Sequence, residues 1–357
     1  MRKIFFSLVV CVSVLGMAEL VAQMFVVPEG AMVQVHSGTH ERSQWLEERN
    51  GSVAAAYQHR TTGGFSKQHF HKRIAVLGGS SVHGGTNNLS DKQEFSALLG
   101  KSLGVEAINL GNPSLDSHDI LAILEELQQY KMDAWVVYTG HNDFGNTYFH
   151  QRYKGWSGTM GAYAYVWMSR RALYRLLQRF VQIPNGNTAL PNPQKQFSGP
   201  QISKGQKIRA LSYFQDNIEK MIWLAQQNNT PIIFIVPMRD LLRAPLGDCR
   251  EEPCSLDLYD QGIALRSTNS QEAVNLLAQA SDADGIPLRV LSSAQEYLRS
   301  VSQKGVFVID APTLLKGGDG IVPSEYFQDH VHLSQKGHQQ LASVLAPFLK
   351  PIVMDAQ

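Results

Sequence analysis

The sequence has no excess of charge of either sign. Its 357 residues include 32 Lys and Arg against 31 Asp and Glu, and charged residues make up only 18% of the chain. A nucleic-acid-binding domain normally carries a basic excess, so this balance argues against a nucleic-acid partner. Hydrophobic residues make up 43%, which is enough for a sizeable core and argues against general disorder.

Cysteine is scarce, with three residues in the whole chain. Cys11 lies inside an apolar run, and the preceding LVV lacks the small residue that a lipoprotein signal needs. Cys249 and Cys254 stand close together in GDCREEPC. In an oxidising compartment their simplest state is one disulfide, and two free thiols are the alternative. Because no second cysteine pair exists, we expect no metal site.

The usual phosphate-binding signatures are also absent. A glycine-rich turn, GGSSVHGG at 78–85, follows an apolar run, but no lysine comes after it until Lys92. A P-loop needs Gly-Lys-Ser/Thr at that point. A dinucleotide fingerprint needs glycines spaced one and then two residues apart, and the turn lacks that spacing as well. We therefore expect no nucleotide and no other cofactor.

The N-terminus carries the longest apolar run. Arg2 and Lys3 precede a stretch that stays mostly apolar from residue 4 to residue 27. A positive flank before such a run predicts export, either with cleavage after Ala18 or as an uncleaved anchor, since ~20 apolar residues span a bilayer. We expect residues 1–27 to anchor the chain in the inner membrane, with the remainder facing the periplasm or cell exterior. Secretion after signal cleavage is the alternative.

The chain beyond the anchor divides into two parts. Residues 28–71 show little periodicity and predict an irregular membrane-proximal segment. In residues 72–350, short apolar runs alternate with amphipathic helices, which predicts an α/β fold with a mostly parallel sheet covered on both faces. The five expected strands are 73–78, 105–111, 133–140, 231–237 and 285–291.

Two stretches, about 145–202 and 239–268, have the character of inserts. They follow strand ends, so we expect them to shape the mouth of a pocket.

Four polar motifs follow in order along this domain: GGSSVHG at 78–84, a block that opens at Asn109, GHND at 140–143 and DHVH at 329–332. In content and order they resemble the SGNH (GDSL-type) hydrolase family, in a bacterial branch with a GHNEF block. The resemblance covers about residues 72–349. It implies a three-layer α/β/α sandwich around a flavodoxin-like sheet of about five strands.

The resemblance also implies roles for individual residues. Ser80 matches the nucleophile of the family's G-D-S motif, although Gly79 stands where aspartate is usual. His332 matches the base and Asp329 the residue that orients it. Asn142 matches the side-chain donor of the oxyanion hole.

The chemistry of this set is coherent. A serine hydroxyl attacks only when an imidazole takes its proton, and a carboxylate fixes that imidazole's tautomer. The second block departs from the family pattern, because Ser114 stands where a glycine normally donates its N–H. A serine retains that N–H, so the expected oxyanion hole consists of Ser80, Ser114 and Asn142.

We expect four further residues to line the pocket: His141, Asp143, Tyr148 and Arg239. The first insert is rich in aromatic side chains, which either stack on sugar rings or pack the insert onto the sheet. They are Tyr148, Tyr153, Trp156, Tyr163, Tyr165 and Trp167.

These features predict a serine esterase that acts on a small-molecule or glycan acyl ester, with no cofactor. An acyltransferase that uses the same residues to acylate a surface polysaccharide is one alternative. An inactive relative that binds a glycan or a protein partner is the other.

Overall fold

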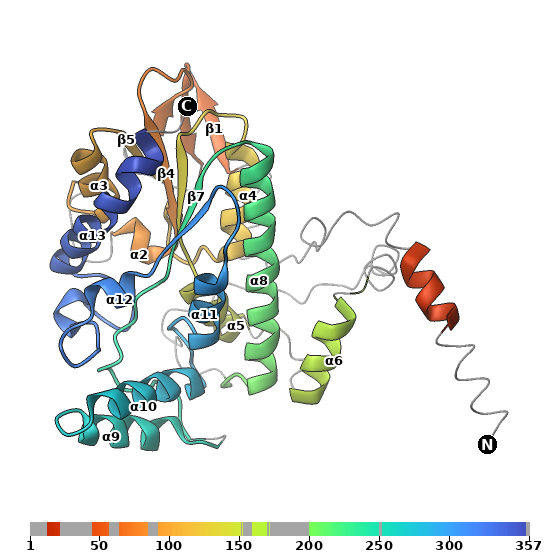
Figure 1. Cartoon of the computed structure of the whole chain (residues 1–357), viewed down its shortest axis with the longest axis vertical. Helices are drawn as coiled ribbons and strands as arrows, with labels where there is room; N and C mark the ends of the chain where they lie inside the picture. Colours follow the sequence, from red (N-terminus) through yellow and green to blue (C-terminus); the bar gives the residue numbers. More distant parts are fainter. Residues whose placement is uncertain are drawn as a thin grey trace.

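The fold is built on a five-stranded parallel sheet (Figure 1). The computed structural model describes residues 13–21, 45–56, 64–84, 92–150, 152, 159–169, 171, 200–249 and 252–354. The strands stand in the order β5-β4-β6-β7-β8, and every neighbouring pair is parallel. This is the flavodoxin-like order, so the predicted fold is confirmed. The strands are β4 (Arg73–Gly78), β5 (Glu106–Asn109), β6 (Ala134–Tyr138), β7 (Ile232–Ile235) and β8 (Val306–Ile309).

Helices cover both faces of the sheet (Figure 1). Alternate residues of β4 point to opposite faces, as the pleat requires: Ala75 and Leu77 join one core cluster, whereas Ile74 and Val76 join the other. The first cluster is covered by α4 (Ser117–Leu127), α8 (Lys204–Gln227) and α11 (Ser292–Ser300). The second is covered by α3 (Phe95–Leu103), α12 (Ala311–Leu315) and α13 (Gln335–Met354).

The predicted fifth strand, 285–291, is wrong. The fifth strand is β8, and residues 284–291 form a largely buried irregular segment. Side chains rather than a neighbouring strand satisfy its backbone: Asp284 Oδ1 accepts from Ile286 N, and Arg239 donates to Val290 O. Pro287 has no N–H to offer to a ladder.

The expectation that residues 28–71 pack irregularly is wrong for their described part. β1 (Leu46–Arg49), β2 (Ser52–Ala55) and β3 (Gly64–Ser66) form an antiparallel sheet of their own. Its apolar side packs into the first core cluster through Trp45, Leu46, Val53 and Phe65. Glu126 of α4 accepts hydrogen bonds from the N–H groups of Trp45 and Leu46, which joins this small sheet to the main domain.

The predicted N-terminal anchor lies mostly outside the described residues. Within it, a helix covers residues 13–21. No helix in the described part of the chain is both long enough and apolar enough to cross a membrane.

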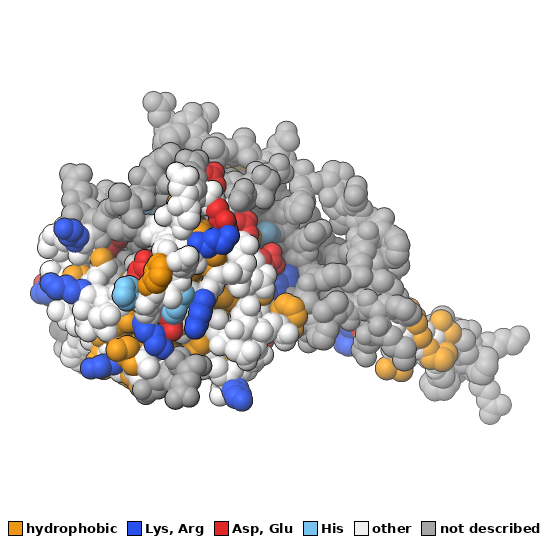
Figure 2. Space-filling model, turned by 90° about the horizontal axis from the view of Figure 1, so that it is seen from above, with side chains coloured by type: hydrophobic (Ala, Val, Ile, Leu, Met, Phe, Trp, Pro, Cys, Tyr) orange, Lys and Arg blue, Asp and Glu red, His pale blue; other side chains and the backbone are white. Residues whose placement is uncertain are grey.

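On the face that Figure 2 presents, Lys and Arg side chains lie apart from one another, between acidic, histidine and neutral side chains.

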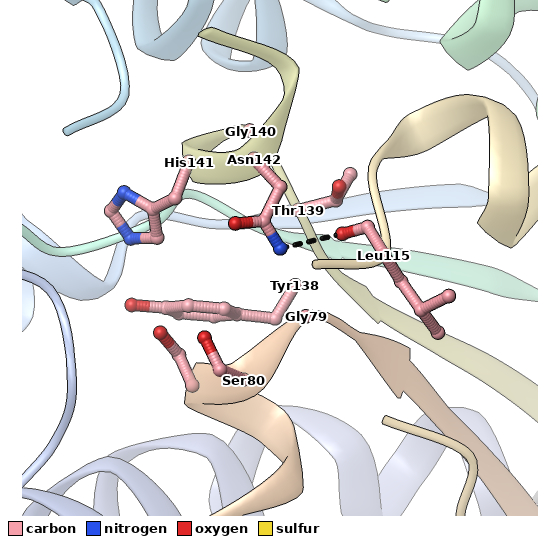
Figure 3. A pocket seen from close by; sticks show the side chains of 9 residues that line it. Gly79, Ser80, Leu115, Tyr138, Thr139, Gly140, His141 and Asn142 are labelled. Carbon is pink, nitrogen blue, oxygen red and sulfur yellow. Dashed lines mark hydrogen bonds between the residues drawn. The ribbon is translucent and has the colours of Figure 1, made fainter. Parts of the chain in front are cut away.

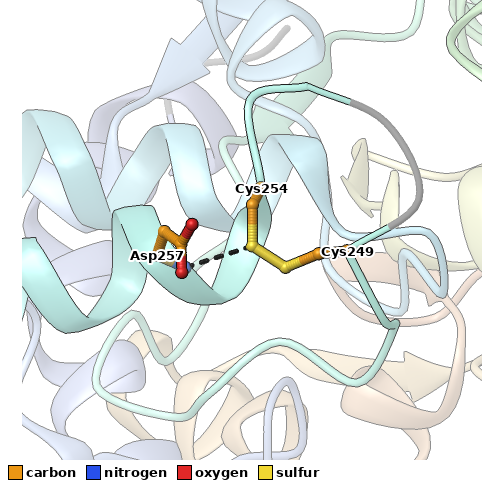
Figure 4. Close-up of a disulfide and its surroundings, with 3 residues drawn as sticks. All are labelled: Cys249, Cys254 and Asp257. Carbon is orange, nitrogen blue, oxygen red and sulfur yellow. Dashed lines mark hydrogen bonds between the residues drawn. A yellow bond between two sulfur atoms is a disulfide. The ribbon is translucent and has the colours of Figure 1, made fainter.

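The second insert is stapled as expected from its two cysteines. Cys249 and Cys254 form a disulfide (Figure 4), and Cys254 Sγ accepts from Asp257 N at the start of the next helix. That helix, α9 (Ser255–Leu265), pairs with α10 (Ser270–Ala283).

The first insert is described only in part. It contains the end of α5 (His141–Phe149) and α6 (Thr159–Ser169), which contacts α8. Tyr163 and Trp167 are exposed on α6. The predicted aromatic residues Tyr153 and Trp156, and the side chain of Tyr165, lie outside what the structure describes.

Candidate active site

Ser80 occupies a sharp turn between a strand and a helix. β4 ends at Gly78, and the short helix α2 (Ser80–His83) begins two residues later. This turn lies at the carboxyl end of a central strand, where parallel sheets place their functional groups. The Ser80 N–H is in the first turn of α2, so it has no acceptor within the helix.

His332 and Asp329 lie beside Ser80, although 252 residues separate Ser80 from His332 in the chain. His332 Nε2 is 2.7 Å from Ser80 Oγ, and His332 Nδ1 is 2.6 Å from Asp329 Oδ2. The carboxylate can only accept, so Nδ1 carries the proton and Nε2 accepts from the Ser80 hydroxyl. The three side chains therefore form one hydrogen-bonded row with the polarity that general-base catalysis needs.

The loop around Asp329 fixes the geometry of this row. Asp329 Oδ1 accepts from the N–H groups of Val331 and His332, at 2.9 and 2.8 Å. Burial alone would raise the pKa of the Asp329 carboxyl, but the hydrogen bonds and the charge of His332 outweigh it and hold the pKa well below its usual range. Asp329 therefore stays ionised throughout the working pH range, ready to stabilise an imidazolium.

Ser81 is a site residue that the sequence analysis missed. Its hydroxyl donates to the Val331 carbonyl at 3.1 Å, which ties α2 to the loop that carries His332. The second serine of the GGSS turn was the available signal, but a serine at a helix start is more often part of the helix terminus than a link to a distant loop.

Asn142 lies at the start of α5, facing the Ser80 turn (Figure 3). Its Nδ2 donates to the Leu115 carbonyl at 2.8 Å. Because an amide nitrogen has two hydrogens, the second remains for a ligand. Nδ2 also passes so close to Gly79 that a Cβ at position 79 would collide with it. The glycine that replaces the family's usual aspartate is therefore required by the present position of Asn142.

Ser114 has the backbone conformation of a glycine. Its φ is +67°, in the left-handed region that few non-glycine residues adopt. Its carbonyl accepts from Asn146 Nδ2 at 2.9 Å, which links it to α5. The substitution for glycine has therefore left the backbone geometry of the second block in place.

A small hollow lies in front of Ser80 (Figure 3). The space in this hollow that water can occupy is about 10 Å³, which is about what one water molecule needs. His141 lines it, as predicted. The other lining residues are Gly79, Ser80, Ser81, Leu115, Tyr138, Thr139, Gly140 and Asn142.

Ser114, Asp143, Tyr148 and Arg239 are not among the residues that line this hollow. Tyr148 is only 2% exposed and packs with Ile202 and Ile286. Arg239 is 5% exposed, and its guanidinium donates to Ser281, Asp282, Val290 and Ser292. Asp143 directly follows Asn142, which lines the hollow, but the side chains of Asp143, Tyr148 and Arg239 are buried in the protein.

The Asp143 carboxyl is buried behind Asn142. Its Oδ1 accepts from both the N–H and the hydroxyl of Ser117. Burial, and then the charge of Asp116, raise the pKa of Asp143 to about 7. The neighbouring Asp116 accepts from Arg152 and Asn146 instead. Burial alone would raise its pKa, but the charges of Arg152 and His118 together with these hydrogen bonds outweigh burial and lower the pKa. The pair connects α4 to α5 and so holds Leu115 beside Asn142.

Among the described residues, no group of three or more His, Cys, Asp and Glu lies close enough together to hold a metal ion. The site offers a nucleophile, a base and several neutral hydrogen-bond donors.

A family model described as GDSL-like lipase/acylhydrolase matches residues 52–345. No curated protein matches the chain.

Several solved structures are similar in fold. A GDSL-like lipase from Bacteroides thetaiotaomicron shares 14% identity, with a TM-score of 0.37 over 78% of this chain and 88% of its own. A member of the lipolytic G-D-S-L family from Veillonella parvula shares 14%, with a TM-score of 0.41 over 78% and 99%. A lipase from a goat rumen metagenome shares 14%, with a TM-score of 0.38 over 77% and 96%.

Proposed function

Because this chain belongs to the family of GDSL-like lipases and acylhydrolases, and is on that ground a hydrolase of ester bonds, we propose that it works through an acyl-enzyme formed on Ser80. The observation that carries the proposal is the unbroken hydrogen-bonded row from Ser80 Oγ through His332 to Asp329. A nucleophile, its base and the residue that orients the base are the parts that acyl transfer needs.

In the first half of the reaction, Ser80 Oγ attacks the carbonyl carbon of the ester while His332 Nε2 takes the hydroxyl proton. The carbonyl oxygen becomes an oxyanion, which the N–H groups of Ser80 and Ser114 and the Asn142 amide bind. When the intermediate collapses, the bond to the alcohol oxygen breaks. His332 returns its proton to that oxygen, and the acyl group stays on Ser80.

In the second half, water takes the place of the alcohol. His332 removes a proton from the water as its oxygen attacks the acyl carbon, and a second oxyanion forms in the same place. Collapse breaks the bond to Ser80 Oγ, which recovers the proton from His332. The products are a carboxylic acid and the free enzyme, and Asp329 remains ionised throughout.

The dimensions of the hollow support a small acyl group. The space in it that water can occupy is about 10 Å³, about that of one water molecule, so the hollow itself does not hold an acyl chain of several carbons. The walls nearest Ser80 are backbone at Gly79 and Gly140, and Gly140 has Val290 packed against it. We therefore propose that acetyl esters are turned over faster than butyryl or longer esters.

A fluorophosphonate probe tests the nucleophile. We expect the full chain to be labelled and Ser80→Ala to remain unlabelled, with turnover of p-nitrophenyl acetate by the parent alone. A folded parent that does not react would overturn the proposal, because its hydroxyl would not be activated.

Unlabelled protein from the same preparation, given an acyl ester as donor, distinguishes hydrolase from transferase. Labelling without turnover in water, followed by product formation when a glycan acceptor is added, would favour the acyltransferase. If the folded chain shows no labelling and no turnover, the result favours the binding protein.

We also propose that the chain is exported. The basic flank and apolar run of its N-terminus and the disulfide between Cys249 and Cys254 support this, because structural disulfides persist mainly in oxidising compartments. Fractionation of the native host with an antibody against the chain tests it, and recovery in the cytoplasm would contradict it.

A further inference from the structure

We propose that His141 donates a hydrogen bond from Nε2 to an oxygen of the bound ester, next to the scissile bond. This inference rests on the proposed function and adds to the oxyanion hole a donor that the motif does not include. It assigns His141 a contact with the substrate rather than a structural role alone.

The ring of His141 is held in one tautomer. Its Nδ1 accepts from the N–H of Val290 at 3.0 Å. A nitrogen that accepts from a backbone amide carries no proton, so in the neutral ring the proton is on Nε2. The irregular segment 284–291 therefore determines which edge of the ring is the donor.

That donor faces the site. Figure 3 shows the His141 ring above the hydroxyl end of Tyr138, with one ring nitrogen turned toward that hydroxyl and toward the side of the hollow where Ser80 lies. His141 is 7% exposed and lines the hollow. The ring centroids of Tyr138 and His141 are 6.1 Å apart at 50°, so the phenol supports the imidazole from below.

Within the described part of the chain, Nε2 has no hydrogen-bond partner of normal geometry. The backbone of Met238 is the nearest alternative partner: it acts on the ring as a hydrogen-bond acceptor that raises its pKa, although the contact falls outside normal hydrogen-bond geometry. The Tyr138 hydroxyl accepts from Met238 N at 2.9 Å and donates to the Met238 carbonyl at 3.5 Å. Buried polar groups in native proteins are nearly always paired, and at a pocket wall the missing partner is best supplied by a ligand.

The donor also keeps its charge state. Burial, followed by the positive charges of His332 and Arg239, lowers the pKa of His141 to about 3. The ring therefore stays neutral while His332 gains and loses a proton during the reaction. A neutral donor fixes an ester oxygen in place without placing a second positive charge beside the base.

Two substitutions separate the two edges of the ring. In His141→Asn, the side-chain carbonyl occupies the place of Nδ1 and can still accept from Val290 N, but the donor at Nε2 is lost. In His141→Gln, an amide N–H reaches about the place of Nε2, while the contact with Val290 is weakened. If the role of His141 is purely structural, the Asn variant should be the more active of the two. If Nε2 contacts the substrate, the Gln variant should be the more active.

His338 provides a matched control. It is also a buried imidazole, 1% exposed, whose Nδ1 accepts from a backbone N–H, that of Phe95 at 3.2 Å. It lies on α13, which covers the second core cluster, and it does not line the hollow. His338→Asn therefore measures what the loss of a buried histidine does to the fold alone.

The experiment measures kcat and KM for p-nitrophenyl acetate, the rate of fluorophosphonate labelling, and Tm, for the full chain and the three variants. We expect His141→Asn to lower kcat/KM and the labelling rate tenfold to a hundredfold, as the loss of a positioned donor does. His141→Gln should retain several times more activity than His141→Asn. His338→Asn should lower Tm and leave kcat/KM within about twofold.

If the parent is labelled, two results would overturn the inference and leave the proposed function intact. One is that His141→Asn is as active as the parent. The other is that His141→Gln is no more active than His141→Asn. A parent that is not labelled at all would overturn the proposed function, and this inference with it.

Discussion

Replacing Gly79 by alanine tests whether the site depends on the close approach of Asn142. The backbone of Gly79 has φ −81° and ψ −153°, an extended conformation at the edge of the β region and outside the left-handed region that favours glycine. The change therefore acts mainly through the added methyl group. That methyl would collide with Asn142 Nδ2 and lie 3.2 Å from the Leu115 carbonyl.

The expected loss follows from the contacts of Asn142. To make room, the amide must swing away from Gly79 and give up its 2.8 Å bond to Leu115. An oxyanion donor moved out of reach lowers kcat ~10²- to 10³-fold, about 2.7–4 kcal/mol of transition-state stabilisation. Aspartate, the family's usual residue at this place, should be at least as harmful here, because its side chain is larger.

A double-mutant cycle shows whether the effect passes through Asn142. Asn142→Ala removes the colliding atom, so Gly79→Ala should add little to it, and the double variant should match Asn142→Ala in kcat. Gly318→Ala is the control, because a Cβ there meets nothing within 4 Å and its φ is not left-handed. It should leave kcat unchanged.

The assay is kcat for p-nitrophenyl acetate at saturation, with Tm to establish folding. A Gly79→Ala variant within threefold of the parent would refute the reasoning. So would a double variant a hundredfold less active than Asn142→Ala, because the methyl would then act on something other than this amide.

Three more outcomes follow from the carboxyl and imidazole groups. The change in Tm caused by Asp143→Asn should be more favourable at pH 8 than at pH 5, by at least about 2 °C. The pKa of this buried carboxyl is about 7, so its ionisation destabilises the folded parent as the pH rises. The same change in Tm at both pH values would contradict this. Between pH 7 and pH 4, the Tm of His338→Asn should fall less than the Tm of the parent. Burial lowers the pKa of His338 to about 4, so below about pH 6.5 the unfolded chain binds a proton that the folded state excludes, and the parent loses stability. Asp329→Asn should lower kcat ~10⁴-fold without unfolding the chain, and a loss below tenfold would show that His332 does not depend on Asp329.

The inner strands β4, β6 and β7 could be predicted because they are buried on both faces, whereas the edge strand β8, which is partly exposed, was missed. Continuous apolar runs such as 73–78 and 231–237 have that character. The small sheet β1–β3 was not predicted, since its strands have only three or four residues each and one polar face. Such strands are recognised by what they pack on, here α4, and not by their own sequence.

The positions of Ser80, Asn142, Asp329 and His332 could be predicted because each stands at a strand end or helix start, and parallel strands bring those ends to one edge. Side-chain direction could not be predicted. Asp143 follows Asn142 directly, but on a helix the two point about 100° apart, so one faces the hollow and the other faces Ser117. The motif places both residues near the site and gives no indication of this difference.

Arg239 belongs to the scaffold of the site and not to its lining. Its guanidinium binds Ser281 and Asp282 at the end of α10, Ser292 at the start of α11, and the Val290 carbonyl between them. The N–H of the same Val290 holds His141. A segment without a strand neighbour keeps one conformation only if side chains satisfy its backbone. Arg239 therefore determines the place of Val290, and through it the orientation of the imidazole that faces the substrate.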